Sequence, residues 1–126
     1  MRRILTITLL FACVGALRLL AASSPQRDPH CQGSACLRIY NVHVGTRCGS
    51  SDSIEADYAN DSPNEYLRGY VVFDSPKGKI YSPTDILKPG EKRQGGAAYV
   101  CHGSGNPSGI ANTGSDPDKL RYPPKN

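Results

Sequence analysis

Tryptophan is missing from this chain of 126 residues, and other large apolar side chains are scarce, with two phenylalanines and one methionine. So few bulky residues fill only a small core, and the length is enough for one small domain. Enzyme signatures are missing too: there is no G-x-S-x-G, P-loop, H-E-x-x-H or dinucleotide-binding fingerprint. The sequence therefore predicts a small non-enzymatic domain that needs cross-links for stability.

Helical periodicity is absent after the first residues, and the chain has no internal repeat. Apolar and polar residues instead alternate in short segments that are separated by proline and glycine turn signals, as at residues 76–78 and 89–90. Strands are predicted over 36–44, 53–59, 65–74, 79–81 and 95–102, and 108–113 is predicted to return as the hairpin partner of 95–102. The phase of the first strand shifts near Asn41, which indicates a bulge. This pattern predicts an all-β fold, a small disulfide-stapled antiparallel β-sandwich of immunoglobulin-like or similar type.

A basic and apolar N-terminus precedes the predicted domain. Met1-Arg2-Arg3 is followed by an almost wholly apolar run over residues 4–17, and then by small residues. This layout is that of a cleaved secretory signal peptide, here residues 1–22. A retained membrane anchor is the alternative, but the run is shorter than the roughly 20 residues that span a bilayer, and Arg18 interrupts it.

The remaining chain divides by composition. Residues 23–35 are polar and predict an extended leader, 36–114 form the predicted β-domain, and 115–126 are polar and proline-rich, which predicts a flexible tail. Leu10-Phe11-Ala12-Cys13 loosely resembles a bacterial lipobox, so lipid attachment at Cys13 is a further alternative to simple cleavage. Export places the mature protein in a secreted or periplasmic setting.

The basic charge of the chain lies mostly in the N-terminal segment. The chain has 15 lysines and arginines against 11 aspartates and glutamates. Three of the arginines belong to the predicted signal peptide, so its removal leaves 12 basic and 11 acidic residues. Nucleic-acid interfaces need clustered basic residues, and only a local patch at residues 88–93 remains. We therefore expect no nucleic-acid partner.

Four cysteines remain after the predicted cleavage, at Cys31, Cys36, Cys48 and Cys101. An even number in a short exported chain indicates two disulfides. The favoured pairing is Cys31 with Cys36 and Cys48 with Cys101, and Cys31–Cys101 with Cys36–Cys48 is the alternative. In the chain-entropy model the short loop stabilises by about 2 kcal/mol and the long one by about 4 kcal/mol.

The segment around Cys101 has a second feature. Tyr99-Val100-Cys101 resembles the late-strand Y-x-C of immunoglobulin domains over these few residues, although the core tryptophan of those domains is absent. The resemblance implies a sandwich that is stapled across its two layers.

Cys101 and His102 are adjacent, which raises the question of a catalytic thiol or a metal site. Neighbouring side chains on a strand point to opposite faces, and an exported thiol tends to be paired, so a nucleophile–base pair is not expected. The cysteine spacings also differ from the close pairs of structural zinc sites. We predict no metal and no cofactor.

Other residues carry the remaining hypotheses. Glu55 and Asp57 share a predicted strand face that alternation assigns to water, and a small hydrolase using both with His43 is the least favoured reading. Tyr66, Arg68 and Tyr70 would form a row suited to recognition. The turn after Cys101 presents three more candidates for partner contact, His102, Ser104 and Asn106. Asn60-Asp61-Ser62 is an N-glycosylation sequon, relevant only to a eukaryotic source.

The sequence thus predicts an exported, non-catalytic β-domain that acts by surface binding to a protein or cell-envelope component. The alternative is an inhibitor or immunity-type protein that blocks an extracellular enzyme by inserting the rigid loop of residues 103–107.

Overall fold

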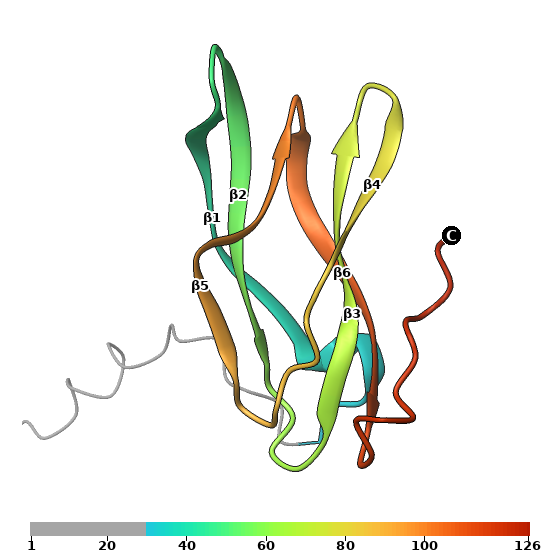
Figure 1. Ribbon diagram of the computed structural model, residues 1–126. Coiled ribbons are helices and arrows are strands. Elements are labelled where there is room, and N and C mark those ends of the chain that lie inside the picture. Colours follow the sequence, from blue (N-terminus) through green and yellow to red (C-terminus); the bar gives the residue numbers. More distant parts are fainter. Residues whose placement is uncertain (1–29) are drawn as a thin grey trace, which may run out of the picture.

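Two antiparallel β-sheets make up the described part of the chain, which is residues 30–126 of a computed structural model (Figure 1). The elements are a short 3-10 helix η1 (Gly33–Cys36) and the strands β1 (Leu37–Cys48), β2 (Ser51–Asn60), β3 (Tyr66–Ser75), β4 (Gly78–Pro83), β5 (Lys92–Cys101) and β6 (Ser104–Gly114). The predicted all-β, antiparallel class is confirmed. The predicted signal peptide, Cys13 and residues 23–29 of the leader lie outside the described residues.

Each sheet has three strands, in the order β1-β2-β5 in one and β4-β3-β6 in the other. The chain crosses between the sheets three times, before β3, before β5 and before β6. The prediction that residues 108–113 pair with 95–102 is therefore wrong, because β6 pairs with β3 in the other sheet. The last crossing occurs at His102, whose left-handed backbone (φ 59°) turns the chain sharply at the end of β5.

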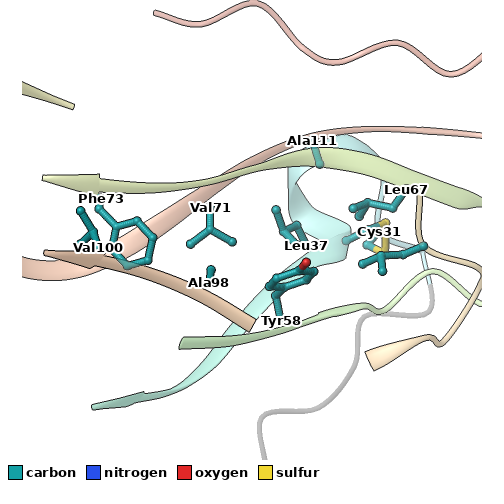
Figure 2. Packing of buried hydrophobic residues seen from close by; sticks show 11 residues of the cluster. Cys31, Leu37, Tyr58, Leu67, Val71, Phe73, Ala98, Val100 and Ala111 are labelled. Carbon is teal, nitrogen blue, oxygen red and sulfur yellow. A yellow bond between two sulfur atoms is a disulfide. The ribbon is translucent and has the colours of Figure 1, made fainter. Parts of the chain in front are cut away.

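The hydrophobic core lies between the two sheets and draws on both (Figure 2). Leu67, Val71 and Phe73 of β3 are at most 1% exposed and form the inner face of this strand. Gly69 interrupts this face because a Cβ there would lie 2.2 Å from the carbonyl oxygen of Ile110. The absence of a side chain at Gly69 thus allows β6 to pack closely on β3. The opposite sheet contributes Leu37, Tyr58, Ala98 and Val100.

Tyr58 is the largest of these inner residues on the β1-β2-β5 sheet. It is 5% exposed, and burial, together with the Asp85 carboxylate, raises the pKa of its phenol above the usual value. The neutral phenol is therefore the form that the folded core accommodates.

Register shifts mark three of the four strands at the edges of the sheets. The β1 ladder shifts between Tyr40 and His43, at the bulge predicted near Asn41, where Asn41 has a φ of 53°. The pairings of β5 and β6 shift once each. The β4 ladder runs from Gly78 to Pro83 without a shift. Bulges blunt a sheet edge against further strand pairing, so β4 is the edge that is left regular.

Both disulfides of the favoured pairing are present, Cys31–Cys36 and Cys48–Cys101. The second one joins β1 to β5, which are the two outer strands of the same sheet. The expectation of a staple across the two layers is therefore wrong, and the bridge differs from the inter-sheet disulfide that Tyr99-Val100-Cys101 suggested.

The ends of the predicted domain also differ from the structure. Cys31 is 8% exposed and belongs to the core, so the packed part of the chain begins before residue 36. The hydroxyl of Thr113 accepts a hydrogen bond from the Gly33 backbone at 2.9 Å, which holds η1 against β6. Residues 115–126, predicted as a flexible tail, lie along the β4-β3-β6 sheet instead and bury Leu120 to 6% exposure (Figure 1). We call this segment the C-terminal strap.

Candidate functional site

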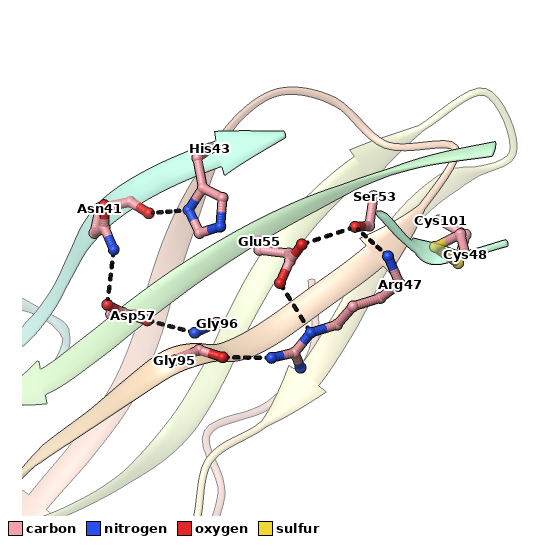
Figure 3. Close-up of polar contacts among 10 residues, drawn as sticks. All are labelled: Asn41, His43, Arg47, Cys48, Ser53, Glu55, Asp57, Gly95, Gly96 and Cys101. Atoms are coloured by element: carbon pink, nitrogen blue, oxygen red, sulfur yellow. Dashed lines mark hydrogen bonds and ion pairs between the residues drawn. A yellow bond between two sulfur atoms is a disulfide. The ribbon is translucent and has the colours of Figure 1, made fainter. Parts of the chain in front are cut away.

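Glu55 and Asp57 lie on the outer face of the β1-β2-β5 sheet, and both are buried, at 6% and 4% exposure (Figure 3). The prediction that both face water is therefore wrong. Strand alternation assigned the correct face, but parts of β1 and β5 cover that face at this point, so burial does not follow the alternation.

The Glu55 carboxylate is held by two side chains. The Arg47 Nε lies 2.9 Å from one of its oxygens, and the Ser53 hydroxyl donates to the other at 3.0 Å. Arg47 also donates to the backbone oxygen of Gly95 on β5. A Cβ at Gly45 would lie 1.2 Å from a Glu55 oxygen, so a side chain at position 45 would displace this carboxylate from its present position. Arg47 therefore links β1 to β2 through the ion pair with Glu55, and β1 to β5 through the hydrogen bond to Gly95.

Asp57 has a separate set of partners. It accepts hydrogen bonds from the Asn41 side chain at 3.0 Å and from the Gly96 backbone at 2.8 Å. The nearest polar contact of His43 is the Asn41 backbone oxygen, 2.8 Å from its Nδ1. Glu55, Asp57 and His43 thus share one face, but each has its own structural partners, and no bond between them joins the three into an acid–base relay. This arrangement supports a role in holding strands together.

The predicted row of Tyr66, Arg68 and Tyr70 lies on the outer face of the other sheet, and all three residues are half-buried. The C-terminal strap covers part of this row. The Arg68 guanidinium donates to the backbone oxygen of Leu120 at 3.1 Å and lies 4.1 Å from the centre of the Tyr122 ring. Tyr122 stacks on Tyr70 with ring centres 4.9 Å apart. Arg68 and Tyr70, which were predicted to contact a partner, therefore contact the chain's own C-terminal strap.

His102, Ser104 and Asn106 are exposed, as a partner site requires. The rigid loop predicted over residues 103–107 does not occur, because Ser104 begins β6 and pairs with Asp74 of β3. Only His102 and Gly103 form the turn. Gly103 packs closely, since a Cβ there would lie 2.6 Å from Val100. The segment therefore continues directly into β6, and residues 105–107 lie at the register shift between the Ser104 and Ser108 pairs with β3.

His102 instead borders a pocket beside β4. The pocket has a volume of about 640 Å³ and is lined by Ser75, Pro76, Lys77, Gly78, Lys79, Ile80, Cys101 and His102. We call it the β4 pocket. Ile80 pairs with Phe73, which faces the core, so the Ile80 side chain points to the inner side of the sheet, yet it remains 40% exposed. The pocket is thus an open continuation of the core, with Lys77 and His102 at its exposed rim.

Reasoning from the sequence missed this pocket. It placed residues 79–81 in a short strand after a turn, which is correct, but gave no partner for the apolar side chain of Ile80. The signal that could have found it is the combination of an isolated isoleucine with nearby lysines in a short predicted strand. Cys101 lines the pocket because the chain crosses between the sheets at His102, and the sequence did not predict that crossing.

Two further observations describe the molecule between residues 30 and 126. No group of three or more histidine, cysteine, aspartate or glutamate side chains in this range is arranged to hold a metal ion. No helix in this range is long and apolar enough to cross a membrane. Comparison of the chain with protein families, with curated proteins and with solved structures finds no significant match.

Proposed function

We propose that this protein is an exported, non-catalytic β-sandwich that binds an extended segment of a protein partner along strand β4. One observation carries the proposal: β4 is the edge strand whose ladder has no register shift, and an apolar pocket lies directly beside it. An extended peptide that adds to a sheet edge gains affinity from backbone hydrogen bonds and specificity from side-chain pockets.

The register of β4 identifies the backbone groups available to such a segment. Pro83 has no N–H and pairs with Tyr70, so this pair does not exchange two hydrogen bonds. Hydrogen-bonded and non-bonded pairs alternate in an antiparallel ladder, so Tyr81 and Lys79 also stand at non-bonded pairs. Their N–H and C=O groups therefore point away from β3, toward the position of an added strand.

The β4 pocket indicates the side chains that such a segment would carry. Ile80, Pro76 and the Cys101 disulfide offer apolar contact, while Lys77 and His102 border the opening. An apolar side chain that enters the pocket and an acidic neighbour that meets the rim would complement this surface. The partner class is therefore a protein segment with mixed apolar and acidic character. If that partner is an extracellular enzyme, the protein acts as its inhibitor.

The test uses peptides selected by display on the purified protein, followed by affinity measurement on three variants. Lys79→Pro removes an outward N–H without removing a hydrogen bond to β3, and Lys79→Ala is its matched control that retains the N–H. We expect Lys79→Pro to weaken binding about fivefold or more and Lys79→Ala to change it less, since one hydrogen bond contributes about 1 kcal/mol. Ile80→Glu should weaken binding as well, by placing a charge in the pocket.

Selected peptides that bind all three variants as tightly as the original protein would overturn the assignment to β4. Circular dichroism of each variant distinguishes a lost site from a lost fold. Activity of a partner enzyme in the presence of the protein then separates simple binding from inhibition.

A further inference from the structure

We infer that the aromatic cluster of Tyr70, Tyr81 and Tyr122 on the outer face of the β4-β3-β6 sheet is a binding site for an alkylammonium group, occupied in this structure by the chain's own Lys125. The site is separate from the β4 pocket, because Tyr81 lies on the opposite face of β4 from Ile80.

The rings are arranged as such a site requires. Tyr70 and Tyr81 meet edge to face, with ring centres 5.6 Å apart and planes at 82°. The Lys125 ammonium lies 5.2 Å from the centre of the Tyr70 ring and 5.6 Å from that of Tyr81. Both distances fall within the range of about 6 Å over which an aromatic ring attracts a cation. Two rings at right angles around one cation form the corner of an aromatic cage.

The cluster is fixed before any ligand arrives. Tyr122 stacks on Tyr70 and donates a hydrogen bond from its hydroxyl to the Thr84 backbone oxygen at 2.8 Å. The Asn112 side chain donates to the Arg121 backbone oxygen at 3.0 Å, which holds the strap on the neighbouring strand. The rings therefore need little reorganisation on binding, which favours affinity.

The occupant is held less firmly than the site. Leu120 is buried and Tyr122 is half-buried, whereas Pro124, Lys125 and Asn126 are exposed. Lys125 contacts the rings of Tyr70 and Tyr81, and the Asn126 backbone oxygen accepts a hydrogen bond from the Tyr81 hydroxyl. An external ammonium that replaces Lys125 would leave the anchor at Leu120 and Tyr122 in place.

The ligand class follows from this occupant. A lysine side chain of another polypeptide or a quaternary ammonium compound both present an alkylammonium to the rings. Ligand binding and the Lys125 contact are mutually exclusive, so removal of the Lys125 charge should strengthen binding of an external cation.

The experiment titrates the purified protein with two probes, tetramethylammonium and N-acetyl-lysine methylamide, against sodium chloride at equal ionic strength. Ring signals of Tyr70 and Tyr81 are followed by NMR. Lys125→Met removes the competing charge and keeps a similar stem. Lys119→Met is its matched control, because Lys119 is an exposed strap lysine that pairs with Asp116.

We expect saturable shifts with at least one probe and an affinity about two- to fivefold higher in Lys125→Met, with Lys119→Met unchanged. The probe that binds more tightly distinguishes a quaternary ammonium ligand from a lysine side chain. Tyr81→Leu should lose the response. The inference is overturned if sodium chloride shifts the rings equally, or if Lys125→Met binds neither probe more tightly than the original protein. The folded state of Lys125→Met does not depend on a buried contact, so this variant keeps the test decisive if Tyr81→Leu unfolds.

Discussion

Asn60 is the polar residue whose side chain connects the largest number of backbone groups in the described structure. It has no exposed surface, and its amide donates to the backbone oxygens of Glu65, Leu87 and Lys88 at 2.8, 3.3 and 3.1 Å. Its side-chain oxygen accepts from the Ser62 backbone at 3.0 Å. The sequon at this position therefore coincides with a buried link between β2 and the segment that precedes β5, and a glycan has no room there in the folded protein.

Replacing Asn60 by alanine should destabilise the protein strongly. The change leaves several buried backbone groups without their partner and opens a small cavity, so we expect a loss of about 2–4 kcal/mol in the free energy of unfolding. Chemical denaturation with Asn106→Ala as an exposed control measures this difference. An equal unfolding midpoint for both variants would mean that water replaces the amide at no cost, contrary to the structure.

Glu55 and Asp57 show, again at the scale of single residues, why strand alternation gave the wrong solvent exposure. A period of two reports which face of a strand a residue occupies, and both residues do share one face. It does not report what covers that face. Here the cover comes from the Asn41 bulge, from Gly96 (φ 70°) and from the Arg47 side chain, each supplied by another strand. The sequence marked Asn41 as irregular, but its contact with Asp57 depends on the register between β1 and β2.

At the scale of elements, strand positions were largely predictable and strand partners were not. The turn at residues 76–77 and the inner face of β3 follow from local pattern. Pairing of β6 with β3 depends on the crossing at His102, where a residue other than glycine adopts a positive φ. Nothing local distinguishes that crossing from a hairpin, so the sheet order, the β4 pocket and the position of the long disulfide could not be derived from the sequence.

The Cys48–Cys101 disulfide supports a prediction at this scale. It closes a loop with a sequence separation of 53 and holds the end of β1 beside the end of β5, with Ser51 and Ser53 of β2 paired between them. Replacing both cysteines by alanine should lower the free energy of unfolding by about 4 kcal/mol in the chain-entropy model. Thermal and urea denaturation of the double variant measure the loss.

A structural readout accompanies the stability measurement. Arg47 is next to Cys48, so release of the β1 end should also loosen the contact between Arg47 and Glu55. Faster amide exchange at Gly96 and Ala98 in the double variant would report this loosening. A variant that retains full stability and protection would show that strand pairing alone holds this end of the sheet.

On the scale of the whole molecule, the C-terminal strap is the feature that composition predicted least well. Its prolines and charged residues are typical of a flexible tail. Its anchors are Leu120 and Tyr122, which depend on Arg68 and Tyr70 in a strand about fifty residues away. The row of Tyr66, Arg68 and Tyr70, predicted from the sequence to bind a partner, thus packs against the C-terminal strap of its own chain. One buried and one half-buried residue in a polar segment are too weak a local signal to identify such packing from the sequence.

Deleting residues 116–126 tests whether the strap is part of the folded unit. Leu120 is 6% exposed, and burial of one large apolar side chain contributes about 1.5–3 kcal/mol. We expect the deletion to lower the free energy of unfolding by at least this amount. Deleting only residues 123–126 retains Leu120 and Tyr122 and should change stability by less than about 0.5 kcal/mol, as surface changes usually do.

Peptide binding at the β4 pocket should survive both deletions, because that pocket is on the other face of β4. Equal stability of the two deletions, measured by urea denaturation, would show that Leu120 and Tyr122 do not anchor the strap in solution.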